Sequence, residues 1–362
     1  MNILYISNLS GNLWAGPNNS VPAQIKAQSK IDNVFWFNIN HNKRDEWTQN
    51  GLDCKNLDDF PSGRLKDFPA PFNRPDIVIV EEFYCFPFCK LIADVQKKKI
   101  PYVIVPRSEM TALAQKNKKW KKCMGNIFYF SKLAKKASGI QFLTEKEKND
   151  SGKKWNKTCF VIPNGIDMPE KQKKIFSADG INASYIGRIE IYQKGLDLLL
   201  NAIIDLKDDL INNSFQLTIY GPNRDGALEI LKEKVRDNYL EDIVFFKEGV
   251  FGQNKADVLL DSDAFIMTSR FEGMPMGLIE ALSYGIPCLA TRGTNLANEI
   301  ERADAGWIAE NDVESIKNAL RDLIFRRDLF KKGQNAIFLA KDFAWDYIAK
   351  ESNLVYSKLI GK

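Results

Sequence analysis

The sequence predicts an α/β protein with two doubly wound domains, each built on a parallel β-sheet. Short apolar runs typical of buried strands alternate with helical stretches from end to end, which is the pattern of βαβ units. The runs form two series of about six, which favours two sheets over one very wide sheet. Between the series, residues 168–180 show no apolar pattern. We therefore expect an N-terminal domain at residues 1–170 and a C-terminal domain at residues 171–345.

The expected strands follow one another in two series along the chain. The first series comprises residues 2–7, 34–38, 76–80, 102–105, 139–143 and 159–162. The second comprises residues 183–186, 216–220, 243–246, 264–268, 287–290 and 306–308. Ligands of doubly wound folds bind at the carboxyl ends of the strands. The expected site is therefore a cleft between the two domains.

Size and composition are those of a globular protein with two cores. The chain has 362 residues, of which 44% are hydrophobic. No apolar run approaches the roughly 20 residues that a membrane-spanning helix needs. The N-terminus has no basic region ahead of an apolar one, so we interpret it as the first strand rather than a signal peptide. Six scattered cysteines form neither a disulfide framework nor a zinc pattern, which indicates free thiols in a cytoplasmic protein.

Positive charge is concentrated in the N-terminal half. Residues 90–174 contain 21 Lys or Arg against 7 Asp or Glu, a net charge of +14 within an overall +5. The densest part, residues 115–136, interleaves lysines with aromatic side chains. Two interpretations stay open, an anionic membrane surface or phosphorylated lipid, and a solvated basic face on a helix packed against the core. Nucleic acid is not an expected partner, because no recognition motif accompanies the charge.

The most informative segment, residues 269–280, places two carboxylates eight positions apart. Glu272 is expected at the end of a strand and Glu280 in the first turns of a helix that Gly285 closes. A Gly- and Pro-containing turn separates them. Backbone N–H groups at the start of a helix bind anions. Carboxylates for hydroxyl groups and amides for phosphate together suit a sugar nucleotide.

Two cations occupy a second strand-to-helix connection. Arg188 follows the expected strand 183–186, and Lys194 precedes the expected helix 196–204. Both side chains should project from the carboxyl edge of the sheet, as the turn at residues 269–280 does. Such a pair neutralises a diphosphate and stabilises it as a leaving group.

Four ordered motifs carry a resemblance to a known family. They are Gly187-Arg188 with Lys194-Gly195-Leu196-Asp197, Glu272-Gly273 with Gly277 and Glu280-Ala281, Val161-Ile162-Pro163-Asn164-Gly165-Ile166-Asp167, and Phe343-Ala344-Trp345-Asp346. The chain resembles the family 4 retaining glycosyltransferases of the GT-B fold. The resemblance is specific over residues 164–307 and loose before residue 100. It implies a C-terminal helix, residues 346–362, that crosses back onto the N-terminal domain.

The resemblance also implies roles for individual residues. Arg188 and Lys194 would hold the donor diphosphate, Glu272 the hydroxyls of the transferred sugar, and Glu280 the hydroxyls of the ribose. If neither residue binds a ligand, Glu272 would be a helix-capping carboxylate, and Glu280 would be an exposed acidic residue in the first turn of a helix, where the helix dipole favours it. The remaining donor-side residues are Gly273, Met274, Met276, Gly277, Leu278, Val250, Asn164 and Gly16.

The chemistry that the resemblance implies is transfer with retention and without a metal. The family's front-face displacement lets the acceptor hydroxyl attack while the nucleoside diphosphate leaves and a donor phosphate oxygen takes the proton. Such a site depends on charge stabilisation and positioning. No metal-binding Asp-x-Asp signature is evident, since Asp261-Ser262-Asp263 falls at the entry of a strand. The implied donor is a UDP- or GDP-sugar, and no cofactor is expected.

The N-terminal half departs from the family at the expected strand 102–105. Many members have a histidine there, whereas this chain has Arg107-Ser108-Glu109, similar to the Pro-Arg-Gly of a subset. A guanidinium cannot act as a general base, but it binds phosphate or carboxylate. The single histidine, His41, lies in a polar loop and is expected to be incidental.

Other acceptor-side residues are expected at the same edge of the first sheet. Glu81 and Glu82 follow the strand 76–80, where they meet acceptor hydroxyls or belong to a solvated loop. The first loop contains Gly11 and Gly16, which would bring backbone to a ligand, and Ser20 is expected to start the first helix. The expected acceptor-side set is Arg107, Ser108, Glu109 and Glu82.

The leading hypothesis is a hexosyl-type glycosyltransferase of capsule, exopolysaccharide or O-antigen assembly. Its acceptor would be a hydroxyl of a glycan or of a polyprenyl-diphosphate-linked glycan, and its location the cytoplasm or the inner face of the cell membrane. A sugar-nucleotide epimerase or hydrolase of the same fold is the second enzyme hypothesis. A non-catalytic protein that binds sugar nucleotides or glycans is the third. A dehydrogenase is disfavoured because no Gly-x-Gly-x-x-Gly follows the first strand.

Overall fold

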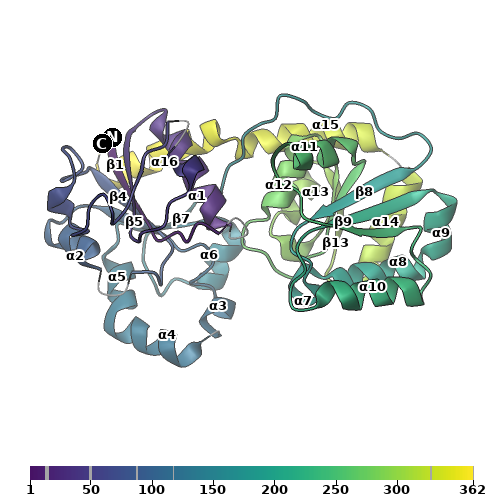
Figure 1. The fold of residues 1–362 in the computed structure, drawn as a ribbon, viewed down its shortest axis with the longest axis horizontal. Coiled ribbons are helices and arrows are strands. Elements are labelled where there is room, and N and C mark those ends of the chain that lie inside the picture. Colours follow the sequence, from purple (N-terminus) through teal and green to yellow (C-terminus); the bar gives the residue numbers. More distant parts are fainter. Residues whose placement is uncertain (13–15, 49–50, 87–88, 117, 327, 362) are drawn as a thin grey trace. The chain divides into compact units, whose positions relative to one another are not determined.

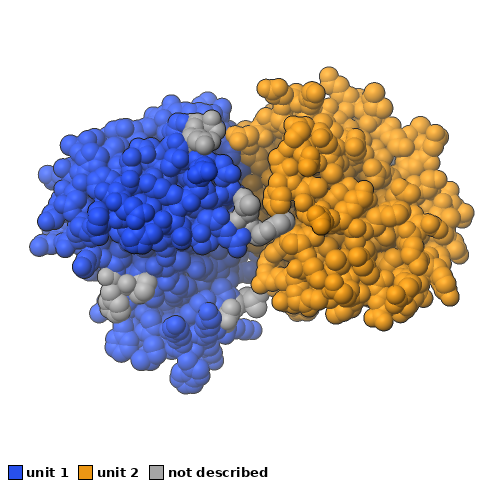
Figure 2. All heavy atoms as spheres, viewed as in Figure 1, with its two compact units in different colours: residues 1–165, 345–362 blue, residues 166–344 orange. Residues whose placement is uncertain are grey.

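The structure, a computed structural model, describes residues 1–12, 16–48, 51–86, 89–116, 118–326 and 328–361. The chain forms two compact units (Figures 1 and 2). Unit 1 comprises residues 1–165 and 345–362, and unit 2 comprises residues 166–344. The chain therefore leaves unit 1 after Gly165, where we expected residue 170, and returns to it after Ala344.

Unit 1 is built on a parallel sheet with the strand order β3-β2-β1-β4-β5-β6-β7. Its strands are β1 Asn2–Ser7, β2 Asn33–Asn38, β3 Cys54–Lys55, β4 Ile77–Glu81, β5 Tyr102–Val105, β6 Gly139–Phe142 and β7 Cys159–Val161. Its helices are α1 Pro17–Ser29, α2 Lys90–Lys97, α3 Ala112–Lys116, α4 Lys119–Gly125, α5 Ser131–Lys136, α6 Glu145–Ser151 and α16 Trp345–Leu359. Short helical turns lie at η1 Asp45–Trp47, η2 Leu65–Asp67 and η3 Asn126–Phe130, the last a π-helix. The central strands are buried apolar runs, as strands covered on both faces must be.

Unit 2 is built on a parallel sheet with the order β10-β9-β8-β11-β12-β13. Its strands are β8 Ile181–Ile186, β9 Phe215–Tyr220, β10 Val244–Lys247, β11 Ala264–Met267, β12 Cys288–Thr291 and β13 Gly306–Ala309. The helices are α7 Ile191–Lys194, α8 Leu196–Asp205, α9 Lys207–Asn212, α10 Ala227–Asp237, α11 Gly252–Asp261, α12 Met276–Ser283, α13 Ala297–Arg302, α14 Val313–Arg326 and α15 Leu329–Ala340. The 3₁₀ turns η4 Arg292–Thr294 and η5 Lys341–Phe343 complete it.

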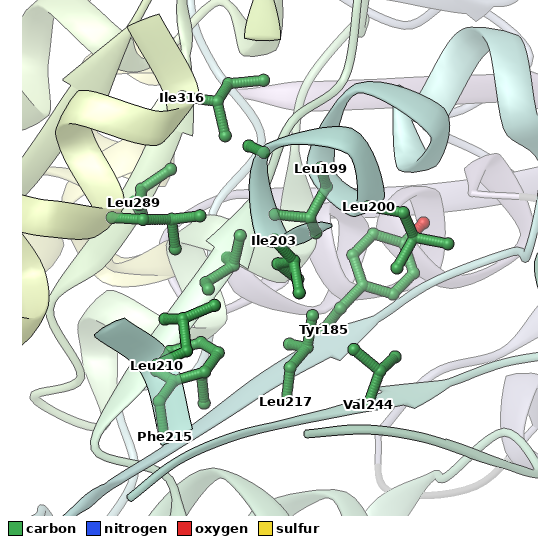
Figure 3. Close-up of a cluster of buried hydrophobic side chains, with 14 of the residues drawn as sticks. Tyr185, Leu199, Leu200, Ile203, Leu210, Phe215, Leu217, Val244, Leu289 and Ile316 are labelled. Carbon is green, nitrogen blue, oxygen red and sulfur yellow. The ribbon is translucent and has the colours of Figure 1, made fainter. Parts of the chain in front are cut away.

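The core of unit 2 fixes α8 on the sheet. Leu199 and Ile203 of α8 point toward Tyr185 of β8 and Leu217 of β9 (Figure 3). These side chains are fully buried. Since α8 begins directly after the loop that carries Arg188 and Lys194, this packing holds the loop at the carboxyl end of β8.

All the expected strands are present, with small shifts at their ends. The sequence did not reveal β3, because this two-residue edge strand has no apolar run of its own. The prediction that Ser20 starts the first helix is wrong. Helix α1 begins at Pro17, whose fixed φ suits the first helical position, and Ser20 lies in its first turn. Pro22 is tolerated inside α1 at the loss of one backbone hydrogen bond.

The C-terminal helix α16 returns to unit 1, as the GT-B resemblance implies. Trp345, Ile348 and Ala349 pack with Ala27 of α1 and with Ile162. The Tyr356 hydroxyl donates a hydrogen bond to Gln141 Oε1 at 2.6 Å. None of the helices in the described ranges combines the length and the apolar character that a membrane crossing requires.

Candidate donor site in unit 2 and polar network in unit 1

The loop after β8 is fixed by a close approach of backbone to backbone. Gly195, between α7 and α8, has a φ of +63°, and a Cβ placed there would lie 2.1 Å from the carbonyl oxygen of Thr268. Thr268 follows β11, and its hydroxyl donates to the carbonyl oxygens of Lys194 and Gly195. Only glycine allows this contact. The cation-bearing loop and the Glu272 turn are therefore held together.

A substitution tests this contact directly. Gly195→Ala is expected to destabilise the protein by about 3 kcal/mol or more, because the methyl group meets a backbone oxygen and φ is left-handed. Gly226→Ala is the matched control, since Gly226 has a φ of +73° but nothing within 4 Å of an added Cβ. The control should lose only about 1 kcal/mol. Urea denaturation measures both, and equal losses would contradict the contact.

A buried ion pair joins the two predicted motifs. Lys194 Nζ lies 2.5 Å from Glu272 Oε1, and each side chain is 10% exposed. The Ser269 hydroxyl donates to the same carboxylate oxygen at 2.6 Å. The Glu272 charge also raises the pKa of buried Tyr185, second to burial itself. Lys194 and Glu272, 78 positions apart in the sequence, thus meet at one sheet edge, whereas the contribution of Ser269 was not foreseen.

Arg188 lies in the same loop and, unlike Lys194, is not held by a carboxylate of the described residues. Its guanidinium donates to Gln193 Oε1 at 3.3 Å, and across the described part of the chain it forms no ion pair. By contrast, Arg270 is held by Asp197 through two hydrogen bonds of 2.7 Å. Arg188 is thus a half-buried cation whose charge is not neutralised by a carboxylate.

The turn that carries Glu272 is held by hydrogen bonds to the loop that follows β12. We expected Glu272 at the end of a strand, but β11 ends at Met267 and Glu272 lies in the following turn. The Glu272 amide donates to Gly293 O at 3.0 Å, and Asn295 donates to the carbonyl oxygens of Glu272 and Gly273. Beyond Met267 the chain leaves the sheet, and the Arg270 amide donates to Gln193 O of α7 at 2.8 Å.

Helix α12 presents an open amino end after this turn. Pro275 is its N-cap and supplies no side-chain hydrogen bond to the first turn. Gly277 packs closely against Phe265 and Met267. A Cβ added to Gly277 would lie 3.3 Å from the Phe265 side chain and 3.4 Å from the Met267 side chain. Met274, Met276 and Leu278 belong to the same apolar cluster. The Met276 and Leu278 amides already donate to the carbonyl oxygens of Met274 and Pro275 at 3.0 Å. Within the described residues, the amides of the segment 273–278 that remain available to an anion are therefore those of Gly273, Met274 and Gly277.

Glu280 lies in α12, as predicted, but its carboxylate is already engaged. Lys255 of α11 forms an ion pair with Glu280 Oε2, and the Glu280 side chain is 32% exposed. Val250 lies in the loop between β10 and α11, the helix that carries Lys255. Lys255 was missed because nothing in the sequence shows which face of α11 turns toward α12.

Arg107 of unit 1 is committed to the protein interior. Its Nε lies 2.8 Å from Glu81 Oε2, and the two side chains are 5% and 0% exposed. The other guanidinium nitrogens donate to Ser20, Gln24 and Asn164 at 3.1–3.2 Å. Arg107 does bind a carboxylate, as its chemistry predicts, but that carboxylate belongs to the protein rather than to an acceptor.

The prediction of Glu81 as a loop residue that meets acceptor hydroxyls or solvent is therefore wrong. Strand β4 extends through Glu81, and its side chain points into the interior, where Arg107 neutralises it. Burial still raises the pKa of Glu81. Three residues at these strand ends, Glu82, Arg107 and Ser108, have φ values of 72°, 47° and 71°. This strained backbone is stabilised by the polar network around Arg107.

Glu109 and Ser108 also serve internal contacts. The Glu109 carboxylate accepts hydrogen bonds from the amides of Phe83 and Tyr84, the latter at 3.0 Å. The Ser108 amide donates to Glu147. Glu82 is half-buried, like Glu109, and it accepts a hydrogen bond from the Cys85 thiol at 3.3 Å. Burial raises the pKa of Glu82 to about 7.

The raised pKa of Glu82 makes stability depend on pH. Between its ordinary value of 4.5 and about 7, the folded protein keeps a proton that the unfolded chain has released. The free energy of unfolding therefore falls as pH rises through this window. Glu81 and Glu109 face the same group and shift in the same direction, so the Glu82 contribution must be taken as a difference between proteins.

Glu82→Gln is expected to gain about 2 kcal/mol relative to the unmodified protein between about pH 4.5 and pH 7. Urea denaturation across this range measures the gain. The solvent-exposed Glu241→Gln is the matched control and should show no such trend. A pH-independent difference for Glu82→Gln would contradict the raised pKa.

Two donor-side predictions fall in unit 1. Asn164 is 5% exposed and accepts a hydrogen bond from Arg107. Gly16 precedes α1, and its carbonyl oxygen accepts from the Ser20 amide at 3.0 Å. A Cβ on Gly16 would meet none of the described residues within 4 Å, so packing against them does not require glycine there. The single histidine, His41, forms a surface pair with Asp58, in which His41 Nδ1 lies 2.6 Å from Asp58 Oδ1.

Within the described residues, the cysteines and acidic residues do not form a metal site. The six cysteines are free thiols. Over the described ranges, no three His, Cys, Asp or Glu side chains are grouped as a metal site would need.

Comparison with known proteins finds a family match within unit 2. Residues 181–325 match the family Glycosyl transferases group 1. The chain is 28% identical over 207 residues to one subunit of human phosphatidylinositol N-acetylglucosaminyltransferase, covering 55% of this chain and 41% of that protein. It is 30% identical over 159 residues to the putative glycosyltransferase EpsF of Bacillus subtilis, covering 40% and 38%. The chain therefore matches about two fifths of the length of these relatives.

Solved structures extend the similarity to the whole chain. Anabaena Alr3699/HepE in complex with UDP superposes with a TM-score of 0.78 at 15% identity, covering 99% of this chain and 100% of that one. This likeness confirms the predicted fold class, with one parallel Rossmann-like sheet in each unit. The match to the group 1 glycosyltransferases, residues 181–325, includes Arg188, Lys194, Glu272 and Glu280.

Proposed function

We propose that this protein is a glycosyltransferase that moves a sugar from a nucleotide-sugar donor to a hydroxyl of a glycan or lipid-linked glycan. The observation that carries the proposal is the carboxyl edge of the unit 2 sheet. Arg188, the Lys194–Glu272 pair and the uncapped amino end of α12 lie in loops that backbone contacts tie together. Cations, amides and a carboxylate at one edge match a diphosphate joined to a sugar.

Each donor-side residue has a distinct role in this proposal. Arg188, which has no carboxylate partner in the described residues, binds the diphosphate directly. Lys194 is oriented by Glu272 and adds a second positive charge. The free lone pairs of Glu272 accept hydrogen bonds from the sugar, while Glu280, positioned by Lys255, accepts them from the ribose.

The backbone completes the donor site. The backbone of Gly273, Met274, Met276, Gly277 and Leu278 contacts sugar and phosphate, and the main chain of Val250 contacts the base. Asn164 and Gly16 are further residues proposed to bind the donor. Unit 1 is the proposed acceptor domain and unit 2 the proposed donor domain. Among the described residues, the space at Gly16 supports a close approach of ligand to backbone.

The proposed reaction retains the anomeric configuration and uses no metal. The acceptor hydroxyl attacks the anomeric carbon on the face from which the nucleoside diphosphate departs. Arg188 and Lys194 stabilise the charge that develops on the departing phosphate, and a phosphate oxygen accepts the hydroxyl proton. The chain's part is charge stabilisation and orientation, so no strong base is needed in unit 1.

UDP- and GDP-sugars are the proposed donors. The structural similarity to a protein solved with UDP supports the first. The side chains of the site do not indicate which base is bound, because the proposed contact with the base is made by the main chain of Val250.

The proposed acceptor is a glycan, carried on a polyprenyl diphosphate or free, that approaches unit 1. Glu82 is the proposed acceptor-side carboxylate, because it is half-buried and accepts a hydrogen bond from a thiol, whereas the Glu109 carboxylate is engaged by two backbone amides. The basic segment 115–136 supports a location in the cytoplasm at the inner face of the membrane.

Incubation with donor alone and with donor plus acceptor tests the proposal. With UDP-glucose or GDP-mannose and a polyprenyl-diphosphate-linked sugar, we expect a glycan longer by one sugar and one nucleoside diphosphate per transfer. Formation of an epimer or of free sugar from donor alone would instead support the epimerase or hydrolase alternative. Binding without any turnover would support a non-catalytic protein.

A further inference from the structure

Helix α4 and the π-helical turn η3 expose a row of large apolar side chains in unit 1. Trp120 is 85% exposed, Met124 51%, Ile127 62% and Phe128 64%. None of the described residues of α4 is buried. We call these four side chains the apolar ridge. Figure 1 shows α4 at the margin of unit 1, outside the layers that cover the sheet.

The ridge occupies one face of the helix, and the opposite face is anchored. Its members recur at spacings of three and four residues, which places them side by side. On the other face, Lys122 Nζ lies over the Tyr84 ring at 4.8 Å and donates to Ala114 O at 2.7 Å. The Tyr84 hydroxyl donates to Asn126 at 3.0 Å, and the Phe130 ring packs on Phe83. The ridge is therefore presented outward by a packed helix.

The segment of the sequence that carries the ridge has charge of a single sign. Between Glu109 and Glu145 the sequence contains no acidic residue. The basic residues of this interval are Lys116, Lys118, Lys119, Lys121, Lys122, Lys132, Lys135 and Lys136. An apolar face flanked by lysines has the composition of helices that lie in the headgroup region of a bilayer. Its charge complements anionic lipid headgroups.

We propose that the apolar ridge inserts into the headgroup boundary of an anionic lipid bilayer and attaches unit 1 to the membrane surface. The lysines attract the surface, and Trp120 and Phe128 supply contact with the acyl boundary that attraction by charge alone does not give. The segment therefore contributes in two ways: its lysines attract the anionic surface, and its exposed apolar side chains insert into it.

The position of the ridge also bears on the acceptor. Tyr84 links the ridge to Glu109, because its amide donates to that carboxylate while its hydroxyl reaches Asn126 and Gln115. A lipid-borne acceptor lying in the bilayer beneath the ridge would thus be close to the strand ends β4 and β5. This step rests on the proposed function, whereas the attachment itself does not.

Vesicle flotation with the full chain tests the attachment without any assay of transfer. The protein should float with phosphatidylcholine vesicles that contain phosphatidylglycerol and stay behind with phosphatidylcholine alone. Trp120→Ser with Phe128→Ser should lower the bound fraction by about tenfold or more. The matched control, Ile230→Ser with Phe338→Ser, replaces two exposed apolar residues of unit 2 and should bind as before.

Fluorescence of Trp120 provides a second, local readout. The other tryptophans in the described residues are at most 7% exposed. Brominated acyl chains should therefore quench emission in the unmodified protein more strongly than in Trp120→Phe, which keeps the ridge apolar. Unchanged flotation of the double serine variant, or equal quenching in both proteins, would overturn the proposal. So would a concentration-dependent dimer that the double serine variant abolishes, with no flotation.

Discussion

Replacing Arg188 by alanine is expected to lower the rate of sugar transfer by roughly a thousandfold. The thermal unfolding temperature should hardly change, because the guanidinium makes one long hydrogen bond, to Gln193, and no ion pair in the described residues. A cation that contributes little to folding and lies at the carboxyl edge of a sheet is available for a ligand. The production of nucleoside diphosphate under saturating donor measures the effect.

Arg302→Ala is the matched control for this variant. Arg302 lies on α13, its side chain is 74% exposed, and its ion pair with Glu299 is at the surface. Transfer should continue at the unmodified rate in this protein. Full activity of Arg188→Ala would contradict the assignment of the leaving group's binding site. A large loss of stability would show that Arg188 has a structural role instead.

Replacing Glu272 by alanine should damage both stability and transfer. The substitution leaves the buried Lys194 ammonium without its carboxylate, and it removes the acceptor for Ser269. Breaking a buried pair from one side costs about 3 kcal/mol or more. The activity of this single variant therefore cannot separate a role in binding sugar from a role in folding. Urea denaturation and the transfer rate must be measured together.

The double replacement Lys194→Met with Glu272→Leu separates the two roles. Removing both charges leaves no unpaired ion, so stability should recover most of what Glu272→Ala loses. Transfer should remain absent, because the diphosphate has lost one of its two cations and the sugar has lost its carboxylate. Recovered activity in the double variant would contradict the proposed roles of both residues. A double variant as unstable as Glu272→Ala would contradict the ion pair as the source of the loss.

The two sheets could be predicted because buried parallel strands are continuous apolar runs with polar, glycine-containing connections. The motifs around Arg188 and Glu272 were recognisable for the same reason, since each follows a strand and precedes a helix. Their meeting at one edge follows from strand order, with β11 beside β8. The contact of Gly195 with Thr268 completes this arrangement, and a glycine before a helix is the only trace that it leaves in the sequence.

The pairings within the sites could not be predicted, because they join residues far apart in the sequence. Lys255 and Glu280 lie on different helices, and the helical period does not reveal which faces turn toward each other. Arg107 looked like a ligand for an acceptor, but the buried Glu81 one strand away occupies it. The exposure of Trp120 was equally hidden, since a basic helix with aromatic residues has the same sequence whether its apolar face points inward or outward.

Isothermal titration calorimetry of UDP, GDP, ADP and dTDP against the unmodified protein and Arg188→Ala tests the donor site most directly. Binding of a nucleotide needs no acceptor, so the result does not depend on the glycan or the membrane. We expect at least one nucleotide to bind with a Kd of about micromolar magnitude, and Arg188→Ala to weaken it by about tenfold or more. Absence of binding by all four nucleotides, or equal affinities of the two proteins, would contradict the proposed site.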